Sequence, residues 1–266
     1  MKSHPTPVPD TDDSGKRGRR PSRIRRVITW VLGTLGVIVV AAVAGILIWS
    51  QVGVMDAEPG PLADVRADSS IAVSDESGAI VLSPAAGGST EGLVFIPGAK
   101  VDPWAYASTL SGVVHDGVTV VITRPWLNLA FFDLRGLDSF TSLAPGIDTW
   151  AVGGHSLGGV RACQLASDAD ALILFASFCS TDVSATDLPV LSISGSADEL
   201  STPAKIADAR PLLPADAELV EIAGASHASF GAYGPQAGDG EATISDDDMT
   251  AKLTELISTF TATLPR

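Results

Sequence analysis

Residues 149–166 read TWAVGGHSLGGVRACQLA, and this stretch decides the fold. An apolar run typical of a buried strand comes first, a glycine-rich turn follows, and an Ala- and Leu-bearing run typical of a helix ends it. The centre, GHSLG at 154–158, has the spacing G-x-S-x-G. Glycines on both sides of a serine let a strand and a helix approach closely at a sharp turn. We therefore interpret Ser156 as a nucleophile held clear of a sheet edge; the alternative is a bystander serine in a glycine-rich turn.

A serine hydroxyl needs a base to take its proton, and in this strand-turn-helix context the acid and the histidine follow the serine along the chain. The chain has four histidines. His4 lies near the N-terminus, His115 precedes the turn, and His155 lies within it. His227, in the loop expected after the last strand, is therefore the candidate base; the alternative is an ordinary surface histidine.

The acid must hold the histidine ring in one tautomer and stabilise its positive charge, which calls for a carboxylate at a strand end. Asp198 follows the apolar run LPVLSISG at 188–195 and precedes the expected helix from Pro203. We expect Asp198 to be this acid, with Glu199 as its main competitor. The alternative is a solvated loop aspartate.

The oxyanion of an acyl-transfer reaction needs two N–H donors, commonly one after the nucleophile and one after the third strand. The amide of Leu157 is the expected first donor. The second should come from FIPGAK at 95–100, where we favour Ala99 over Lys100. The alternative is an ordinary strand-to-helix loop.

Apolar β-branched runs alternate with helix-like segments after residue 62, which predicts an α/β fold with a mostly parallel eight-stranded sheet flanked by helices. The short spacing between Phe178 and Val190 leaves no room for a large cap. Asp102 before Pro103 and Thr202 before Pro203 are expected helix caps. The expected strands are 71–74, 79–83, 93–96, 118–123, 149–153, 171–176, 190–194 and 219–222, and the expected helices are 103–114, 127–142, 157–167, 203–209 and 247–264.

Residues 27–49 form an uncharged apolar stretch, long enough as a helix to cross roughly 30 Å of hydrocarbon. Residues 1–26 are rich in Pro, Asp, Ser and Arg, which predicts a disordered tail, and the basic residues just before the span keep it cytoplasmic by the positive-inside rule. The expected order is then a single-pass transmembrane helix in the cell membrane, a linker at 50–62, and an extracytoplasmic domain at 63–266. The alternatives are a cleaved signal peptide, whose apolar region is normally shorter, and a buried core helix.

Charge is distributed unevenly along the chain. Residues 1–49 hold 8 of the 17 Lys and Arg but 3 of the 31 Asp and Glu, so the rest of the chain has a net charge of −19. Such an acidic domain is repelled by phosphate backbones, which makes nucleic acid an unfavourable partner. The two cysteines, Cys163 and Cys179, lack the spacing of a zinc site, and no metal site is expected. They are either one disulfide or two buried thiols.

Four segments carry a resemblance to a known family. They are PGAKVDPWAY at 97–106, GGHSLGG at 153–159, SGSADELSTP at 194–203 and GASHASFGAYGPQAGDG at 224–240. In these the chain resembles the α/β-hydrolase superfamily, and within it the small dienelactone-hydrolase-like proteins, α/β-hydrolase family 5. The resemblance covers roughly residues 70–264. Dienelactone hydrolases have cysteine at the nucleophile position, where this chain has Ser156.

The resemblance implies a serine hydrolase that cleaves an ester or related acyl bond of a small-molecule or lipid-like substrate through an acyl-enzyme on Ser156, with no metal or organic cofactor. A peptidase or an acyltransferase remains open, and so does a catalytically silent domain that serves as a binding module in the envelope. Trp104, Phe131 and Phe132 are expected to pack in the core or, as the alternative, to line an acyl pocket. The segment 228–240 has no assigned role; a flap over the site is one hypothesis.

Overall fold

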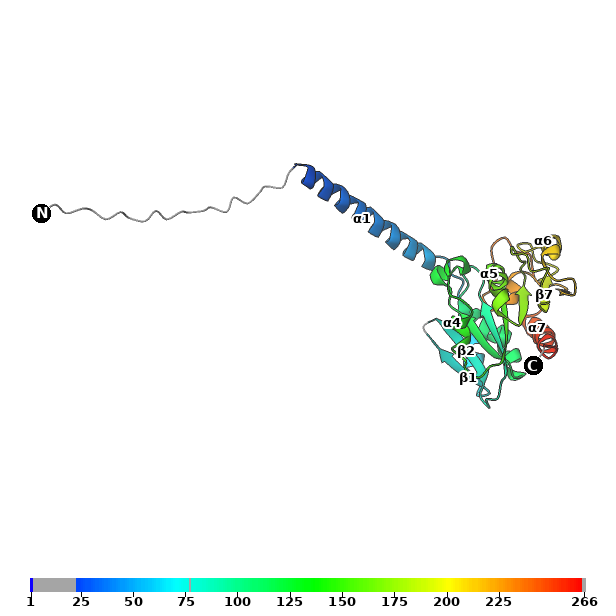
Figure 1. Ribbon diagram of the computed structural model, residues 1–266. Coiled ribbons are helices and arrows are strands. Elements are labelled where there is room, and N and C mark those ends of the chain that lie inside the picture. The colour runs from blue at the N-terminus through cyan, green and yellow to red at the C-terminus, as the bar shows by residue number, and fades with distance from the viewer. Residues whose placement is uncertain (2–22, 77, 265–266) are drawn as a thin grey trace. The chain divides into compact units, whose positions relative to one another are not determined.

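The expected strands form one eight-stranded sheet within the described residues, 1, 23–76 and 78–264 (Figure 1). The strand order is β1-β2-β4-β3-β5-β6-β7-β8. Strand β2 runs antiparallel to β1 and to β4, and all other neighbours are parallel, which confirms the mostly parallel sheet. The strands are β1 (Ile71–Asp75), β2 (Ala79–Pro84), β3 (Glu91–Ile96), β4 (Thr119–Thr123), β5 (Thr149–His155), β6 (Ala171–Phe175), β7 (Val190–Gly195) and β8 (Glu218–Ile222).

The central strands are continuous apolar runs because helices cover both faces of the sheet. Every residue of β4, β6 and β7 is buried, whereas the edge strands β1 and β8 are largely exposed. Side chains alternate between the two faces: in β3, Leu93 and Phe95 join one core, and Val94 and Ile96 join the other. The continuous hydrophobic runs are thus explained by burial on both sides.

Helices lie on both faces of the sheet. On one face α3 packs against β2 and β4, and α2 and α7 pack on α3. On the other face α5 packs against β3, β5 and β6, and α4 packs against β3 and β4. The helices are α2 (Pro59–Ala67), α3 (Ala107–His115), α4 (Asp138–Thr141), α5 (Leu157–Leu165), α6 (Pro203–Asp208) and α7 (Asp246–Thr261), with short 3-10 turns η1 (Pro103–Tyr106), η2 (Trp126–Asn128), η3 (Ala130–Phe132), η4 (Ala166–Asp168), η5 (Arg210–Leu212) and η6 (Ala228–Phe230).

Both expected proline-started helices have their caps. Asp102 accepts from the amide of Trp104 at the start of η1, and Thr202 accepts from the amide of Lys205 at the start of α6. Each cap satisfies an amide that the helix itself leaves unpaired. These caps fix the points where the loop after β3 meets η1 and where the loop that carries Asp198 meets α6.

One predicted helix is wrong. The segment 127–142 forms η2, η3 and the four-residue α4. Leu127 and Asn128 adopt left-handed φ values of 59° and 56°, which ends any regular helix at its first residues. Phe131 and Phe132 are also more than half exposed, at 55% and 51%, so their expected burial in the core is wrong as well.

The chain divides by its contacts into two units, Met1–Leu47 and Ile48–Arg266. The first unit contains most of α1 (Arg23–Gln51), whose side chains from Val27 to Leu47 are exposed. Among the described residues, α1 is the one helix long and apolar enough to cross a membrane. Of the tail expected at residues 1–26, residues 2–22 lie outside the described residues, and residues 23–26 belong to α1.

The start of the second unit is ordered by contacts with the rest of the domain. Met55 forms a parallel bridge with Val101, the amide of Glu58 donates to the carbonyl of Ala232, and α2 begins at Pro59. The segment expected as a linker is thus partly helical and is tied to the domain at several points.

The two cysteines form a disulfide. Cys163 in α5 is joined to Cys179, four residues beyond the end of β6, with the two Cα atoms 5.5 Å apart. Of the two interpretations left open by the sequence, one bridge or two thiols, the structure has the bridge.

Candidate active site

Ser156 lies at the turn between β5 and α5, at the carboxyl edge of the sheet. Its backbone has φ 51° and ψ −121°, in the left-handed region. A residue with a side chain reaches that region at a cost of about 1–3 kcal/mol, and such strain is typical of functional sites. Two hydrogen bonds hold the turn: the Ser156 amide donates to Phe175 O at 2.9 Å, and Ser177 Oγ donates to Ser156 O at 2.6 Å.

The glycines on either side of Ser156 are required by close backbone contacts. A methyl group at Gly158 would collide with the carbonyl oxygen of Ile96, and one at Gly154 would lie 2.5 Å from the carbonyl carbon of Gly158. The strand, the turn and the helix cannot approach in this way if either position carries a side chain. This is the physical basis of the G-x-S-x-G spacing here.

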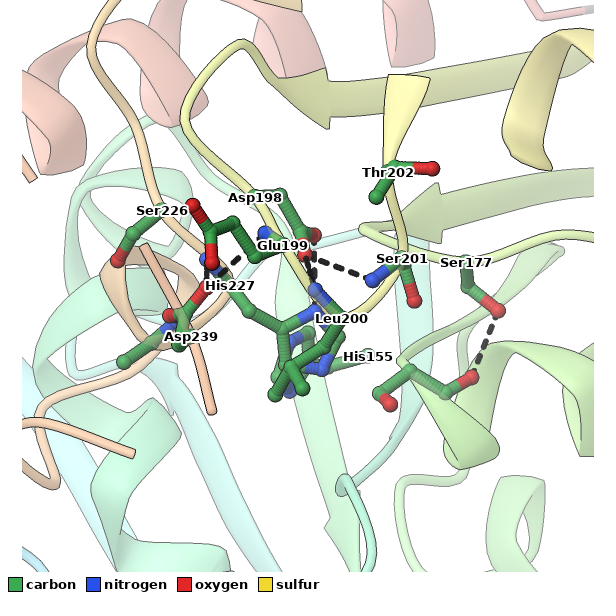
Figure 2. A network of polar contacts seen from close by, with 12 residues as sticks. His155, Ser177, Asp198, Glu199, Leu200, Ser201, Thr202, Ser226, His227 and Asp239 are labelled. Carbon is green, nitrogen blue, oxygen red and sulfur yellow. Dashed lines mark hydrogen bonds and ion pairs between the residues drawn. The ribbon is translucent and has the colours of Figure 1, made fainter. Parts of the chain in front are cut away.

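Asp198 and His227 form a buried pair (Figure 2). His227 Nδ1 lies 2.8 Å from Asp198 Oδ2, and the side chains are 2% and 0% exposed, respectively. The other carboxylate oxygen accepts from the amides of Leu200, at 2.8 Å, and Ser201, at 2.7 Å. An ionised carboxylate can only accept, so beside an ionised Asp198 the donor is His227 Nδ1, and a neutral ring then keeps its lone pair at Nε2. The competitor Glu199 has an exposed side chain.

The structure brings the serine turn and the histidine loop together through the residue next to Ser156. The ring of His155 lies 4.5 Å, centroid to centroid, from the ring of His227. Among the hydrogen bonds of the described residues, none joins Ser156 Oγ to His227. Catalytic hydrogen bonds are often long or misaligned without substrate, so the absence of this bond is compatible with a catalytic serine.

His155 is a buried neutral partner of this arrangement. Its Nδ1 lies 2.8 Å from the hydroxyl of Tyr106, which in turn accepts from the amide of Gly98 at 3.0 Å. Burial, and then the nearby His227, lower the pKa of His155 well below its usual value. Burial also raises the pKa of Tyr106. The chain of contacts from Gly98 to His155 links the loop after β3 to the serine turn.

Two amides at this edge have no protein acceptor. Within the described part of the chain, the amides of Leu157 and Ala99 donate no hydrogen bond, whereas the amide of Lys100 donates to Asn128 O at 2.8 Å. Leu157 is also the first residue of α5, where helix amides are unpaired and the helix dipole favours negative charge. Of the two candidates in the loop after β3, Ala99 is therefore the one with a free donor.

Asp239 is a residue that the sequence did not single out. Its Oδ1 accepts from the amides of His227 at 3.1 Å, Gly240 at 2.8 Å and Glu199 at 3.4 Å, and its Oδ2 accepts from Ala228 at 2.8 Å. In Figure 2 this carboxylate lies between the loop of Asp198 and the loop of His227. One side chain thus fastens the two loops that hold the buried pair.

The ionisation of Asp239 follows from these contacts. Burial alone would raise its pKa, but hydrogen bonds from the amides of Ala228, His227 and Gly240 and from Ser226 outweigh burial and lower it. The sequence signal for Asp239 is weak, because its partners are backbone amides, which nearly every residue has whatever its side chain. A carboxylate between two glycines, shortly after the candidate histidine, is the signal that could have found it.

The segment 228–240 is packed rather than free. Phe230 and Tyr233 are buried in the core, and the Tyr233 hydroxyl donates to Gln236 at 3.0 Å. The hypothesis of a flap therefore loses its support. Hollows of about 430 and 500 Å³ lie beside this segment, and neither is lined by Ser156, Asp198 or His227.

No group of three or more His, Cys, Asp or Glu side chains that could hold a metal ion occurs in residues 23–76 and 78–264.

Comparison with known proteins identifies the family. Residues 92–251, more than half of the chain, match the model of an alpha/beta hydrolase family. A comparison with curated proteins found no match. The matched region runs from β3 into α7 and includes the serine turn, the Asp198–His227 pair and Asp239. The chain belongs to the α/β hydrolase family.

Proposed function

We propose that the protein is a serine hydrolase that cleaves an ester or related acyl bond, with Ser156 as nucleophile, His227 as general base and Asp198 as the acid that orients it. The observation that carries the proposal is the buried hydrogen bond of 2.8 Å between Asp198 and His227, next to a serine held at φ 51°. Family membership supports a hydrolase, and the serine mechanism is our inference from this geometry.

The proposed reaction has two halves. Ser156 Oγ attacks the acyl carbon while His227 Nε2 takes the hydroxyl proton, and the same proton then passes to the leaving alcohol. Water next attacks the acyl-enzyme, giving a proton to His227, which returns it to Ser156 Oγ as the acid is released. The amides of Leu157 and Ala99 would stabilise the negative charge that develops on the acyl oxygen in each half.

The protein is further proposed to be tethered to the outer side of the cell membrane. We assign residues 1–26 to a cytoplasmic tail, 27–49 to the membrane span, 50–62 to a connecting segment and 63–266 to the hydrolase domain. The length and composition of α1 support the span, and the basic residues that precede it support a cytoplasmic N-terminus. The disulfide supports an oxidising compartment for the domain.

Within the family, we propose membership of the dienelactone-hydrolase-like group, on the motifs at 97–106 and 224–240. The residues that the second motif contributes include His227 and Asp239, so it forms part of the proposed site. Serine in place of cysteine at the nucleophile favours an acyclic ester over a lactone as substrate.

The test is covalent labelling of the full chain in detergent with a fluorophosphonate, which reacts with activated serines. We expect the wild type to be labelled and Ser156→Ala not to be, with Ser180→Ala, which changes an exposed serine, as the control. Labelling that survives in Ser156→Ala would place the nucleophile elsewhere. A panel of nitrophenyl esters of increasing acyl length then defines the substrate range.

A second candidate is a catalytically silent hydrolase domain that acts as a binding module in the envelope. The observation in its favour is that Ser156 Oγ has no hydrogen bond to His227 among the described residues. A wild type that resists the fluorophosphonate and hydrolyses no ester would support this alternative. A labelled wild type that transfers its acyl group to amines or alcohols faster than to water would instead indicate an acyltransferase.

A further inference from the structure

The segment between β4 and α4 carries exposed apolar side chains. Trp126, Phe131, Phe132 and Leu134 are 52%, 55%, 51% and 77% exposed, and we call the segment 126–134, which carries them, the apolar loop. Single exposed apolar residues are ordinary, but several large ones in one short segment indicate a surface that binds an apolar partner.

The backbone of the apolar loop is held in place by a partly buried ion pair. Arg135 Nη2 lies 2.6 Å from Asp133 Oδ2, and the same nitrogen donates to Arg124 O at 2.8 Å. Asp133 is 5% exposed, and its neighbours on both sides are exposed apolar residues. The left-handed conformations of Leu127 and Asn128 add strain that the fold must offset. The apolar side chains therefore point outward from an ordered segment.

Asn128 joins the apolar loop to both the loop after β3 and the residues that follow the membrane span. Its carbonyl accepts from the amide of Lys100 at 2.8 Å, and its side-chain nitrogen donates to Ser50 O at 3.1 Å. Lys100 Nζ donates to Trp49 O at 2.6 Å and to Val52 O at 2.8 Å and lies 4.0 Å from the centre of the Trp49 ring. All these residues belong to the unit Ile48–Arg266.

These contacts bring the apolar loop close to the point where the chain leaves the proposed span. Trp49 is the last residue of the apolar stretch, and Asn128 contacts the next residue, Ser50. Each residue lengthens the chain by at most about 3.6 Å, so Ser50 lies within one residue of the bilayer if residues 27–49 cross it. Because Asn128 contacts Ser50, the apolar loop is then also close to the bilayer. Aromatic side chains favour the membrane interface.

We propose that the apolar loop inserts into the surface of the bilayer that carries the protein, and that the substrate is an ester with a long acyl chain dissolved in that bilayer. The inference rests on the proposed membrane span and serine chemistry. Because Lys100, which binds the apolar loop, directly follows Ala99, the acyl oxygen would be received beside the inserted side chains. Residues 50–266 have a net charge of −19, which opposes attraction to anionic headgroups, so we assign the binding of this surface to apolar insertion.

Insertion is tested by fluorescence quenching of the full chain in vesicles of lipids brominated on the acyl chain. The emission due to Trp126 is the difference between the wild type and Trp126→Phe; that due to Trp150 is the difference between the wild type and Trp150→Phe. Trp150 is the matched control, because it lies at the start of β5, at the edge of the sheet opposite Ser156. We expect brominated lipid to quench the Trp126 emission at least about twofold more than the Trp150 emission, and added salt not to weaken this. Equal quenching would overturn the proposal.

The substrate class is tested by comparing a long-chain nitrophenyl ester in vesicles with a short, water-soluble one. For the combined variant Phe131→Ser, Phe132→Ser and Leu134→Ser, the ratio of vesicle to soluble activity should fall about tenfold. The matched control is Val73→Ser with Leu219→Ser, which removes exposed apolar residues from the edge strands β1 and β8 and should leave the ratio unchanged. An unchanged ratio in the apolar-loop variant would overturn the substrate class.

The two tests separate this inference from the proposed function. If Ser156→Ala keeps full activity, the serine mechanism is wrong, while the quenching result still decides whether the apolar loop inserts. If Ser156→Ala is inactive and Trp126 is quenched no more than Trp150, the serine mechanism stands and insertion of the apolar loop is wrong.

Discussion

Ser156 combines a reactive hydroxyl with a backbone conformation that suits glycine. With φ 51° and ψ −121°, any Cβ at this position is strained. We expect Ser156→Gly to be more stable than Ser156→Ala by about 1 kcal/mol, because strain relief exceeds the greater flexibility of glycine in the unfolded chain. The measurement is denaturant unfolding of both variants in the same detergent. Equal stabilities would show that the turn is not strained.

Asp198 and Glu199 are adjacent in sequence but differ in burial, so they form a matched pair of variants. Asp198→Asn should reduce kcat by about 10³- to 10⁴-fold, because an amide can stabilise the wrong tautomer of His227 and cannot neutralise its charge. Glu199→Gln should have less than about a twofold effect, since its side chain is exposed. Steady-state kinetics on one soluble ester compares the two. A larger effect at Glu199 would reassign the acid.

Asp239 is expected to act as a positioning residue through the two loops it fastens. Asp239→Asn puts an N–H donor against amides that need acceptors, and the resulting shift of His227 should lower kcat about tenfold with little change in KM. Glu241→Gln, two residues away and exposed, is the control and should behave as the wild type. A rise in KM with kcat unchanged would instead indicate that Asp239 contacts the substrate.

The same variant changes how stability depends on pH. The pKa of Asp239 is lowered in the fold, so its carboxylate stabilises the protein above its unfolded pKa of about 3.9, and this contribution is lost as the pH falls. The difference in unfolding free energy between the wild type and Asp239→Asn should therefore be constant near neutral pH and shrink below about pH 4. A difference that grows in acid would contradict the assigned ionisation.

At the level of elements, the strands were predictable and the loops were not. All eight expected strands are present, and the central ones were the clearest, because burial on both faces leaves a continuous hydrophobic pattern in the sequence. The segment 127–142, expected as one helix, instead forms η2, η3 and the short α4. The left-handed Asn128 contacts Lys100 and Ser50, which are distant in sequence, so no local pattern announces where this helix is interrupted.

The site was predictable to the extent that its residues follow strand ends. Ser156 directly follows β5, while Asp198 and His227 lie in the loops after β7 and β8, and the carboxyl ends of parallel strands meet at one edge of the sheet. The role of Asp239 was not predictable, because it acts through backbone amides. The strand order, in which β3 lies between β4 and β5, also leaves no local signal in the sequence.

The disulfide links two elements that support the serine turn. It joins α5, which begins just after Ser156, to the loop after β6, across a sequence separation of 16 residues. Closing a loop of that length stabilises the fold by about 3 kcal/mol in the chain-entropy model. The double variant Cys163→Ala with Cys179→Ala should lose about that much unfolding free energy. Reductant should lower the Tm of the wild type and leave that of the variant unchanged.

At the level of the whole molecule, the proposed topology places the hydrolase domain outside the cell and the N-terminal tail in the cytoplasm. Intact cells treated with an external protease should lose the domain while the N-terminal tail, detected through an added epitope, stays protected. Lysed cells are the control for access to the tail. A domain that survives shaving of intact cells would reverse the proposed topology, and a protein found entirely in the medium would favour a cleaved signal peptide.

The contacts of Lys100 have a practical consequence for soluble versions of the protein. A version that starts at residue 53 would lack both carbonyls, those of Trp49 and Val52, that its ammonium group binds. One that starts at residue 57 would also lack the bridge from Met55 to Val101. Either truncation loosens the segment beside Ala99, so weak turnover by a short recombinant form would reflect where it was cut. The shortest faithful starting point is Ile48.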